Sequence, residues 1–171
     1  MSKGSRATRE HREGAPRGLR VAVITVSDTK DEASDESGRS LRTGAVDAGH
    51  RVVHYGIVRD EIPEIRGALE TAIRLGVDAV IMDGGTGAAH RDVTVEAVAP
   101  LLEKTLDGFG DLFRLLSFRK VGSAAMLSRA VAGVYRGAAV FCLPGSPDAV
   151  TLAWNDLIRP ELPHLVGLLR K

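Results

Sequence analysis

The sequence predicts an α/β fold built on a mainly parallel β-sheet. From Leu19 onward, short apolar runs rich in β-branched residues alternate with segments of helical periodicity, the pattern of strand–helix–strand units. The apolar runs are nearly continuous, as expected for strands that are covered on both faces. Such units join parallel strands through right-handed crossovers. The 171 residues, 44% of them hydrophobic, suit one domain with a sizeable core.

Four segments have the composition of strands. The first, LRVAVITV, is a continuous β-branched run, and the second, RVVHYGIV, has a similar composition. The third is the short run DAVIM, and the fourth, GAAVFCLPG, ends in a Pro-Gly turn. We therefore expect strands at 19–26, 51–58, 78–82 and 137–145.

Six segments are predicted to be helical. In the second of them, apolar residues recur every three or four positions along one stripe, and Gly76 is placed to end the helix. Pro100 is expected to kink or split the third helix, and Pro160 to break the last one. The predicted helices cover 38–48, 61–76, 95–106, 108–122, 123–133 and 147–169.

The first 18 residues differ in composition from the rest of the chain. Residues 1–18 carry five Lys and Arg side chains against two Glu and almost no apolar residues, so we predict a solvated basic tail before a folded domain at 19–171. Without aromatic residues or a folded motif, these charges do not indicate a nucleic-acid partner. The polar start and the lack of a long apolar run predict a cytoplasmic protein that does not enter membranes. The lone Cys142 is expected to be a buried small apolar residue.

Polar loops follow the predicted strands. The segments SDT, VRDE, DGGTG and LPGSP each stand directly after one of the four expected strands. In open α/β sheets, ligands bind in the crevice outside the carboxyl ends of the strands. We therefore expect these four loops to share a ligand.

The glycine-rich loop carries the strongest local signal. Gly84, Gly85 and Gly87 lack a Cβ, so main-chain N–H groups there can approach an anion closely, and Thr86 adds a hydroxyl. The loop matches neither a Walker loop nor the dinucleotide fingerprint. A tight strand-to-helix turn is an equally good interpretation of these residues on their own.

Two acids follow strands at the same predicted edge of the sheet. Asp92, two residues before Thr94, could cap a helix that begins near Val93, and Asp60 could cap the helix that contains Pro63. Both could instead hold a divalent metal ion against phosphate oxygens, for which hard carboxylate ligands are suited. Because both acids lie at strand ends, the metal–phosphate interpretation is favoured.

Seven motifs occur together in a fixed order: SDT…DESG, AGH, IVRDE, GGTG…RDVTVEA, GFGDLFR, LSRAVAG and LPGSP. In this the chain resembles the MoaB/Mog family of molybdenum cofactor biosynthesis proteins, which is related to the G domains of plant and animal molybdopterin adenylyltransferases. The resemblance spans roughly 19–170. The short length and the LPGSP form are closer to the MoaB branch.

The resemblance implies a three-layer α/β/α sandwich that assembles as homotrimers, often paired into homohexamers. It implies magnesium- and ATP-dependent adenylylation of molybdopterin with release of pyrophosphate, and possible contact with other enzymes of the cofactor pathway. In the Mog branch two aspartates matter for catalysis; they match Asp60 and Asp92, which would also hold the Mg²⁺. The residues matching the family's ligand-binding loops are Ser27, Asp28, Asp83, Gly84, Gly85, Thr86, Gly87, Thr94, Ser128, Gly145 and Ser146.

Asp83 departs from the family pattern, which usually has Thr or Ser before GGTG. Its carboxylate either turns away from the ligand, binds the metal or the amino groups of the pterin, or lowers the affinity for nucleotide. Two other functions stay open: a carrier that binds molybdopterin without adenylylating it, and a nucleotide pyrophosphatase like the related domain of competence-damage proteins.

Overall fold

The computed structural model describes residues 16–171. Most of the predicted basic tail, residues 1–15, lies outside the described residues. Within the described part of the chain, no helix is long and apolar enough to span a membrane.

The elements alternate along the chain as the sequence predicts. In chain order they are β1 (Arg20–Val26), α2 (Glu36–Asp47), β2 (Arg51–Val58), α3 (Ile62–Arg74), β3 (Ala79–Asp83), α4 (Thr94–Val98), η1 (Ala99–Leu101), β4 (Lys104–Thr105), α5 (Asp107–Val121), η2 (Gly122–Leu127), β5 (Val131–Tyr135), β6 (Ala138–Leu143), α6 (Pro147–Leu152), η3 (Ala153–Ile158) and α7 (Arg159–Leu169). Here η1 and η2 are 3₁₀ helices, and η3 is a π-helical segment.

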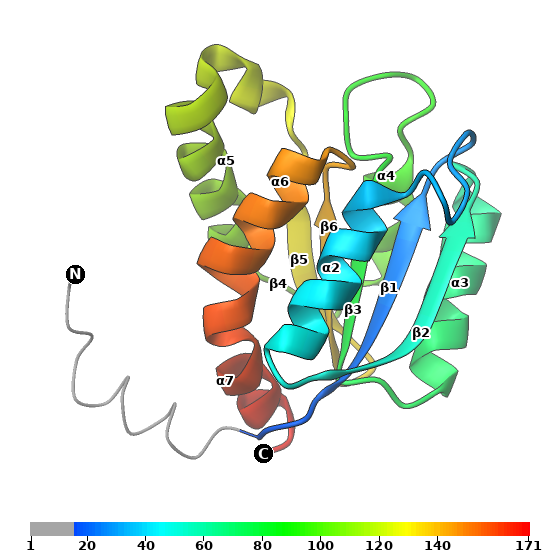
Figure 1. Cartoon of the computed structure of the whole chain (residues 1–171), viewed down its shortest axis with the longest axis vertical. Helices are drawn as coiled ribbons and strands as arrows, with labels where there is room; N and C mark the ends of the chain where they lie inside the picture. The colour runs from blue at the N-terminus through cyan, green and yellow to red at the C-terminus, as the bar shows by residue number, and fades with distance from the viewer. Residues whose placement is uncertain (1–15) are drawn as a thin grey trace.

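The sheet is six-stranded, with strand order β2-β1-β3-β6-β5-β4. The neighbours from β2 to β6 are paired in parallel, whereas β5 is antiparallel to both β6 and β4. Helices α2, α6 and α7 lie on the near face of the sheet in Figure 1, and α3 lies on the far face. The prediction of a mainly parallel sheet between two helical layers is confirmed.

Each face of the sheet has its own hydrophobic core. Along β1, Val21 and Val23 belong to the cluster under α2, α5, α6 and α7, while Ala22 and Ile24 belong to the cluster under α3 and α4. All four residues are buried. The continuous apolar run follows from this arrangement, because alternate side chains of a strand enter opposite cores.

All four predicted strands are confirmed to within two residues at each end. Cys142 lies in β6 and is buried, also as predicted.

The predicted helix over 95–106 is wrong in its second half. Helix α4 ends at Val98, a 3₁₀ turn containing Pro100 follows, and Lys104–Thr105 forms the edge strand β4. The N–H groups of Glu103 and Leu106 bond to carbonyl groups of β5, at 2.8 Å each. Proline ends the helix, and pairing with the sheet edge then satisfies the backbone that follows it.

The predicted helix over 123–133 is also wrong. A 3₁₀ segment occupies Gly122–Leu127, and Val131–Tyr135 is strand β5. Arg136 and Gly137 both have positive φ, 47° and 77°, and form a two-residue turn that joins β5 to β6 as a hairpin. Antiparallel pairing with β6 therefore prevails over the helical propensity of the Ala-rich segment.

The predicted break of the closing helix near Pro160 is wrong: the helix continues from α6 to α7 through a π-helical segment, Ala153–Ile158. This wider turn places Pro160 in the first turn of α7, where an α-helix does not need the missing N–H. The helix changes its hydrogen-bond pattern there and continues.

Candidate functional site: a glycine cradle between two carboxylates

The loops after β1, β3 and β6 meet at one edge of the sheet. A Cβ on Gly84 would overlap the main-chain carbonyl of Val26, and a Cβ on Gly145 would lie 3.0 Å from the Cα of Gly84. The loop after β2 joins them, because the N–H of Ser27 donates to the carbonyl of Val58 at 2.8 Å. The four loops that the sequence assigns to a shared ligand therefore converge.

The glycine loop adopts a conformation that only glycine accommodates easily. Gly84 and Gly85 have φ of 99° and 62°. Thr94 holds the turn from the start of α4: its N–H donates to the Gly85 carbonyl and its hydroxyl donates to the Gly84 carbonyl, each at 2.9 Å. The loop is thereby fixed to the helix that follows it.

Three successive main-chain donors of this loop are unused. Within the described part of the chain, the N–H groups of Gly85, Thr86 and Gly87 make no hydrogen bond. Successive N–H groups in a glycine-rich turn form a concave site for anions. The tight turn, one of the two interpretations of the sequence, is present, and the anion site stays a prediction that these N–H groups suit.

Asp60 lies against this loop, after β2. A Cβ on Gly85 would be only 2.7 Å from both of its carboxylate oxygens. Its Oδ1 accepts a hydrogen bond from the N–H of Val93 at 3.1 Å. Burial raises the pKa of Asp60 above its usual value, and the negative charges of Asp92 and Asp28 act in the same direction, against the Val93 N–H and Arg91.

Asp92 lies against the same loop, beside Gly87. A Cβ on Gly87 would be 2.7 Å from its Oδ2, which accepts a hydrogen bond from the N–H of Ala89 at 2.9 Å. Neither aspartate caps the helix considered for it from the sequence, since the N-caps of α4 and α3 are Val93 and Glu61, without side-chain hydrogen bonds. Both acids instead lie against the glycine loop.

The donor chemistry of the two acids suits a hard divalent cation. Asp60 Oδ2 and Asp92 Oδ1 accept no hydrogen bond from other described residues. Among residues 16–171 no group of three or more His, Cys, Asp or Glu side chains is arranged to hold a metal ion. Magnesium needs no such group, because it usually binds one or two carboxylates together with substrate phosphates and water.

Arg129 holds the glycine loop from the segment before β5, and sequence reasoning did not single it out. Its guanidinium donates to the carbonyl groups of Gly87 and Asp92, at 2.8 Å each, and forms an ion pair with Glu96. Its N–H also donates to the Thr86 carbonyl at 3.3 Å. The motif LSRAVAG contained the signal, because an arginine there supplies several donors in a fixed planar arrangement.

We expect Arg129→Lys to speed hydrogen exchange in the glycine loop at least tenfold while leaving the fold intact. Lysine keeps the charge but cannot reach both carbonyl groups, so the loop loses at least one hydrogen bond from a charged donor, a loss of about 1.5–3 kcal/mol locally. Hydrogen exchange of the 84–92 amides, measured beside the circular dichroism spectrum, checks this. Unchanged exchange in the loop would contradict the role of Arg129.

Two hollows are lined by residues of the converging loops, one beside the glycine loop and one beside the loop after β6. One, of about 440 Å³, is lined by loop residues with Asp92, Glu96 and Arg129. The other, of about 220 Å³, is mainly apolar and is lined from α5, η2 and α6, with Lys120, Ser128 and Ser146 among its residues. The Ser128 Oγ is buried and makes no hydrogen bond to the described residues. Lys120 is not among the residues predicted for the site, since the sequence places it only in a Ser-x-x-Lys pattern, SFRK at 117–120, that does not by itself indicate acyl transfer.

Three of the predicted ligand-binding side chains are buried, namely Asp83, Thr86 and Thr94. The Thr94 hydroxyl is used within the loop, and the Asp83 side chain turns beneath the loop toward Thr25, so direct ligand contact by these two side chains does not fit this structure. The Thr86 Oγ1 has no hydrogen-bond partner among the described residues. Of the alternatives for Asp83, the structure shows the one in which the carboxyl turns away.

The remaining predicted residues stabilise their own loops or link them to neighbouring ones. Ser27 accepts hydrogen bonds from the N–H groups of Thr29 and Lys30, and Asp28 forms an ion pair with Arg91. Ser146 is the N-cap of α6. The Gly145 carbonyl accepts hydrogen bonds from Ser37, at 2.9 Å, and from Lys30, at 3.3 Å. Lys30, also missed from the sequence, thereby places a positive charge beside this loop.

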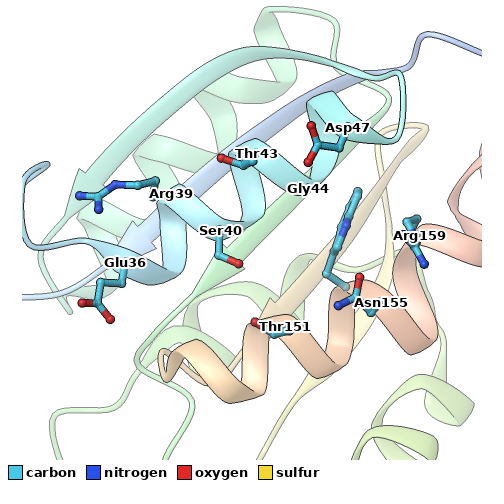
Figure 2. Close-up of a pocket in the computed structure, with 10 residues that line it drawn as sticks. Glu36, Arg39, Ser40, Thr43, Gly44, Asp47, Thr151, Asn155 and Arg159 are labelled. Carbon is cyan, nitrogen blue, oxygen red and sulfur yellow. The ribbon is translucent and has the colours of Figure 1, made fainter.

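A larger hollow, of about 460 Å³, lies elsewhere, between α2 and the helix formed by α6 and η3. Figure 2 shows Ser40 and Thr151 between these two helices, whereas Arg39 extends away from them. None of the predicted site residues lines it, and its charged residues are of both signs: Glu36, Arg39, Asp47 and Arg159. Its size alone does not make it the functional site.

The fold and the site together define an α/β protein in which a glycine loop lies against two carboxylates at the carboxyl ends of parallel strands, the place where open α/β sheets bind ligands. Residues 22–164 match the family model described as a probable molybdopterin binding domain. The chain therefore belongs to this family of molybdenum cofactor biosynthesis proteins, as the resemblance predicted.

Related proteins cover nearly the whole chain. Molybdenum cofactor biosynthesis protein B of Bacillus subtilis is 47% identical over 96% of this chain and 98% of its own. A crystal structure of a molybdenum cofactor biosynthesis protein B has a TM-score of 0.88 and 46% identity, covering 91% of this chain and 98% of its own. The tungsten cofactor synthesizing protein MoaB from Pyrococcus furiosus has a TM-score of 0.83 and 40% identity, covering 92% and 100%.

Proposed function

We propose that this protein acts in molybdenum cofactor biosynthesis and adenylylates molybdopterin, with Mg²⁺-ATP as the second substrate. The observation that carries this proposal is the pair of carboxylates of Asp60 and Asp92 beside the unused N–H groups of Gly85, Thr86 and Gly87. The similarity to molybdenum and tungsten cofactor biosynthesis proteins supports the pathway, and the chemistry of the loop supports the reaction.

The reaction needs no protein nucleophile. An oxygen of the pterin phosphate forms a bond to the α-phosphorus of ATP, and the bond from that phosphorus to the bridging oxygen breaks, so that pyrophosphate leaves with the electron pair. The obstacle is the repulsion between two polyanions, which costs several kcal/mol in a cleft of low dielectric constant. Positioning and charge stabilisation therefore supply most of the catalysis.

Different residues of the site would position the phosphates and stabilise their charge. The N–H groups of Gly85, Thr86 and Gly87 would orient the α-phosphate and stabilise its added charge. Asp60 and Asp92 would hold Mg²⁺, which when bound neutralises oxygens of the departing pyrophosphate. Asp60 suits this role because its Oδ1 is fixed by Val93 and its Oδ2 is unused.

The mainly apolar hollow is suited to the pterin. Phe113 and Leu152 supply apolar walls, and Ser128 supplies a buried hydroxyl without a partner among the described residues. Lys120 would supply a positive charge for the pterin phosphate, and Asp148, which also lines the hollow, could accept a hydrogen bond from the amino group of the pterin. A flat heterocycle with one anionic end requires such a combination of apolar walls and a few convergent polar groups.

The test is a direct assay. Purified protein mixed with molybdopterin, ATP and Mg²⁺ should release pyrophosphate and form an AMP-bearing pterin. If no product forms while an active relative turns over in the same mixture, the enzymatic proposal fails. Calorimetry then decides for or against the carrier, which would bind molybdopterin without Mg²⁺-dependent binding of ATP.

We further propose that the chain forms the trimer or hexamer that the family resemblance implies, through an apolar surface on α5 and η2. Six large apolar side chains there are between 49 and 77% exposed: Leu112, Leu115, Phe118, Val121, Met126 and Leu127. Exposed apolar groups on this scale mark interaction surfaces. The surface adjoins the pterin hollow through Val121.

Phe118→Glu is expected to produce monomers that remain folded, because a charge at this 59% exposed position opposes burial in an interface but not folding. Light scattering after gel filtration measures the mass. Val46→Glu, equally exposed but on α2, is the matched control and should keep the assembly of the wild type. A wild type that is already monomeric would refute the proposed interface.

A further inference from the structure

A chain of four buried or partly buried polar groups lies directly beneath the glycine loop. Asp83 and Thr25 are register partners on the adjacent strands β3 and β1. The chain continues from Thr25 to Asp35, before α2, and from Asp35 to Tyr55 on β2. Asp83 and Asp35 are both completely buried. Because these two buried acids both contact the Thr25 hydroxyl, the protonation state of each has to be established.

The Thr25 hydroxyl lies within hydrogen-bond distance of both carboxyl groups. The Thr25 Oγ1 lies 2.6 Å from Asp35 Oδ2 and 3.0 Å from Asp83 Oδ2. A hydroxyl donates only one hydrogen, so it cannot donate to both carboxylates at once. One of the two contacts must therefore use a hydrogen that belongs to a carboxylic acid.

The surroundings show which acid holds that hydrogen. Asp35 accepts hydrogen bonds from the N–H of Gly38 at 3.0 Å and from the Tyr55 hydroxyl at 2.8 Å, and Lys30 Nζ lies 3.5 Å from it. These are the partners of an anion. Asp83 has only Thr25, and its Oδ1 is buried without a partner among the described residues.

The pKa shifts of the two acids agree with this assignment of the hydrogen. Burial raises the pKa of Asp83 to about 7, and the negative charge of Asp35 adds to the rise, against the Thr25 hydroxyl and Lys30. Burial also acts to raise the pKa of Asp35, but the hydrogen bonds from Thr25, Gly38 and Tyr55, together with the charge of Lys30, lower it below its usual value. The charged groups that act on Asp83 are thus Asp35 and Lys30.

We propose that Asp83 is a neutral carboxylic acid that donates its hydrogen to Thr25, and that an anion binds the glycine loop more tightly when this proton is present. Asp83 is followed directly by Gly84, and its Oδ1 lies 3.9 Å from the Cβ position of Gly145. Its ionisation would place a negative charge between the two loops that line the site. The assignment of the proton stands on its own, and the linkage to anion binding rests on the proposed function.

The sign of the pH effect on folding follows from the raised pKa. The folded chain keeps the proton of Asp83 up to about pH 7, whereas the unfolded chain loses it near 3.8. The folded state therefore loses stability as the pH rises between these two values and loses no more above the higher one.

The first experiment compares the wild type with Asp83→Asn by denaturant unfolding from pH 5 to pH 8.5. Asparagine keeps the shape and can donate its N–H to Thr25. We expect the midpoint of the variant to rise relative to the wild type as the pH increases, and to exceed it at pH 8.5. Asp47→Asn, an exposed acid on α2, should follow the wild type throughout. A variant less stable than the wild type by a constant amount at every pH would overturn the proton assignment.

Infrared spectroscopy supplies an independent measurement. The wild type at pH 6 should show a protonated-carboxyl band that is absent from Asp83→Asn at pH 6 and from the wild type at pH 9. A wild-type spectrum without such a band at pH 6 would refute the neutral acid even if the variant failed to fold.

The linkage is tested with Mg²⁺-ATP as the probe. The ratio of the affinity of Asp83→Asn to that of the wild type should increase about tenfold between pH 6 and pH 8.5, and titration of the nucleotide itself cancels in this ratio. A constant ratio overturns the linkage. If neither protein binds Mg²⁺-ATP, the proposed function and the linkage both fail, while unfolding and infrared spectroscopy still decide the proton assignment.

Discussion

Asp92→Asn is expected to lower the adenylylation rate about a thousandfold without unfolding the protein. Asparagine keeps an oxygen that can accept the hydrogen bond from the Ala89 N–H, so the geometry of the loop should be preserved. It removes the negative charge that would hold Mg²⁺ opposite Asp60. Loss of a metal-held charge from phosphoryl transfer removes several kcal/mol of transition-state stabilisation, which corresponds to a factor of this size.

The measurement is pyrophosphate release at saturating ATP over a range of Mg²⁺ concentrations. If Asp92 binds the ion, the variant should need more Mg²⁺ to reach its reduced rate, an effect that a purely structural role would not produce. Asp47→Asn, remote from the loop, is the matched control and should retain the wild-type rate. A rate equal to that of the wild type would mean that Asp92 only stabilises its own turn through the hydrogen bond from Ala89.

The strands were predictable because of where their side chains go. Val21, Val23 and Ile81 enter one core, while Ala22 and Ile24 enter the other, so the sequence is apolar without interruption. Strand β5 was not predictable in this way. The Ala-rich residues before it extend the predicted helix to Gly133, whereas the turn at Arg136–Gly137 and pairing with β6 and β4 make Val131–Tyr135 a strand. Long-range pairing of this kind leaves little trace in local propensity.

The loops that form the site could be predicted from the sequence, whereas the orientation of individual side chains within it could not. Asp60 and Asp92 follow strands that end at the same edge of the sheet, so their convergence follows from topology. The direction of the Asp83 side chain depends on its register opposite Thr25, whose hydroxyl it contacts at 3.0 Å. The role of Arg129 depends on three partners from 33 to 42 positions away in the sequence. Neither could be derived before the fold was known.

Gly85→Ala should abolish detectable turnover, because the added methyl group affects both the N–H groups of the glycine loop and the carboxylate of Asp60. The new methyl group would lie 2.7 Å from both carboxylate oxygens of Asp60 and would overlap the Thr94 hydroxyl. Neither neighbour can move freely, since Asp60 is bonded to the Val93 N–H and Thr94 to the Gly84 carbonyl. The φ of 62° adds strain of about 1–3 kcal/mol.

Gly67→Ala is the control for this variant. Gly67 lies within α3, and no atom stands within 4 Å of its Cβ position, so alanine should stabilise the fold by about 0.5–1 kcal/mol and leave turnover unchanged. Thermal unfolding separates loss of the fold from loss of the site: Gly85→Ala should melt a few degrees lower yet stay folded at assay temperature. Since the methyl group displaces Asp60 and covers the N–H groups together, a Gly85→Ala protein that still adenylylates at the wild-type rate would show that phosphate binds elsewhere.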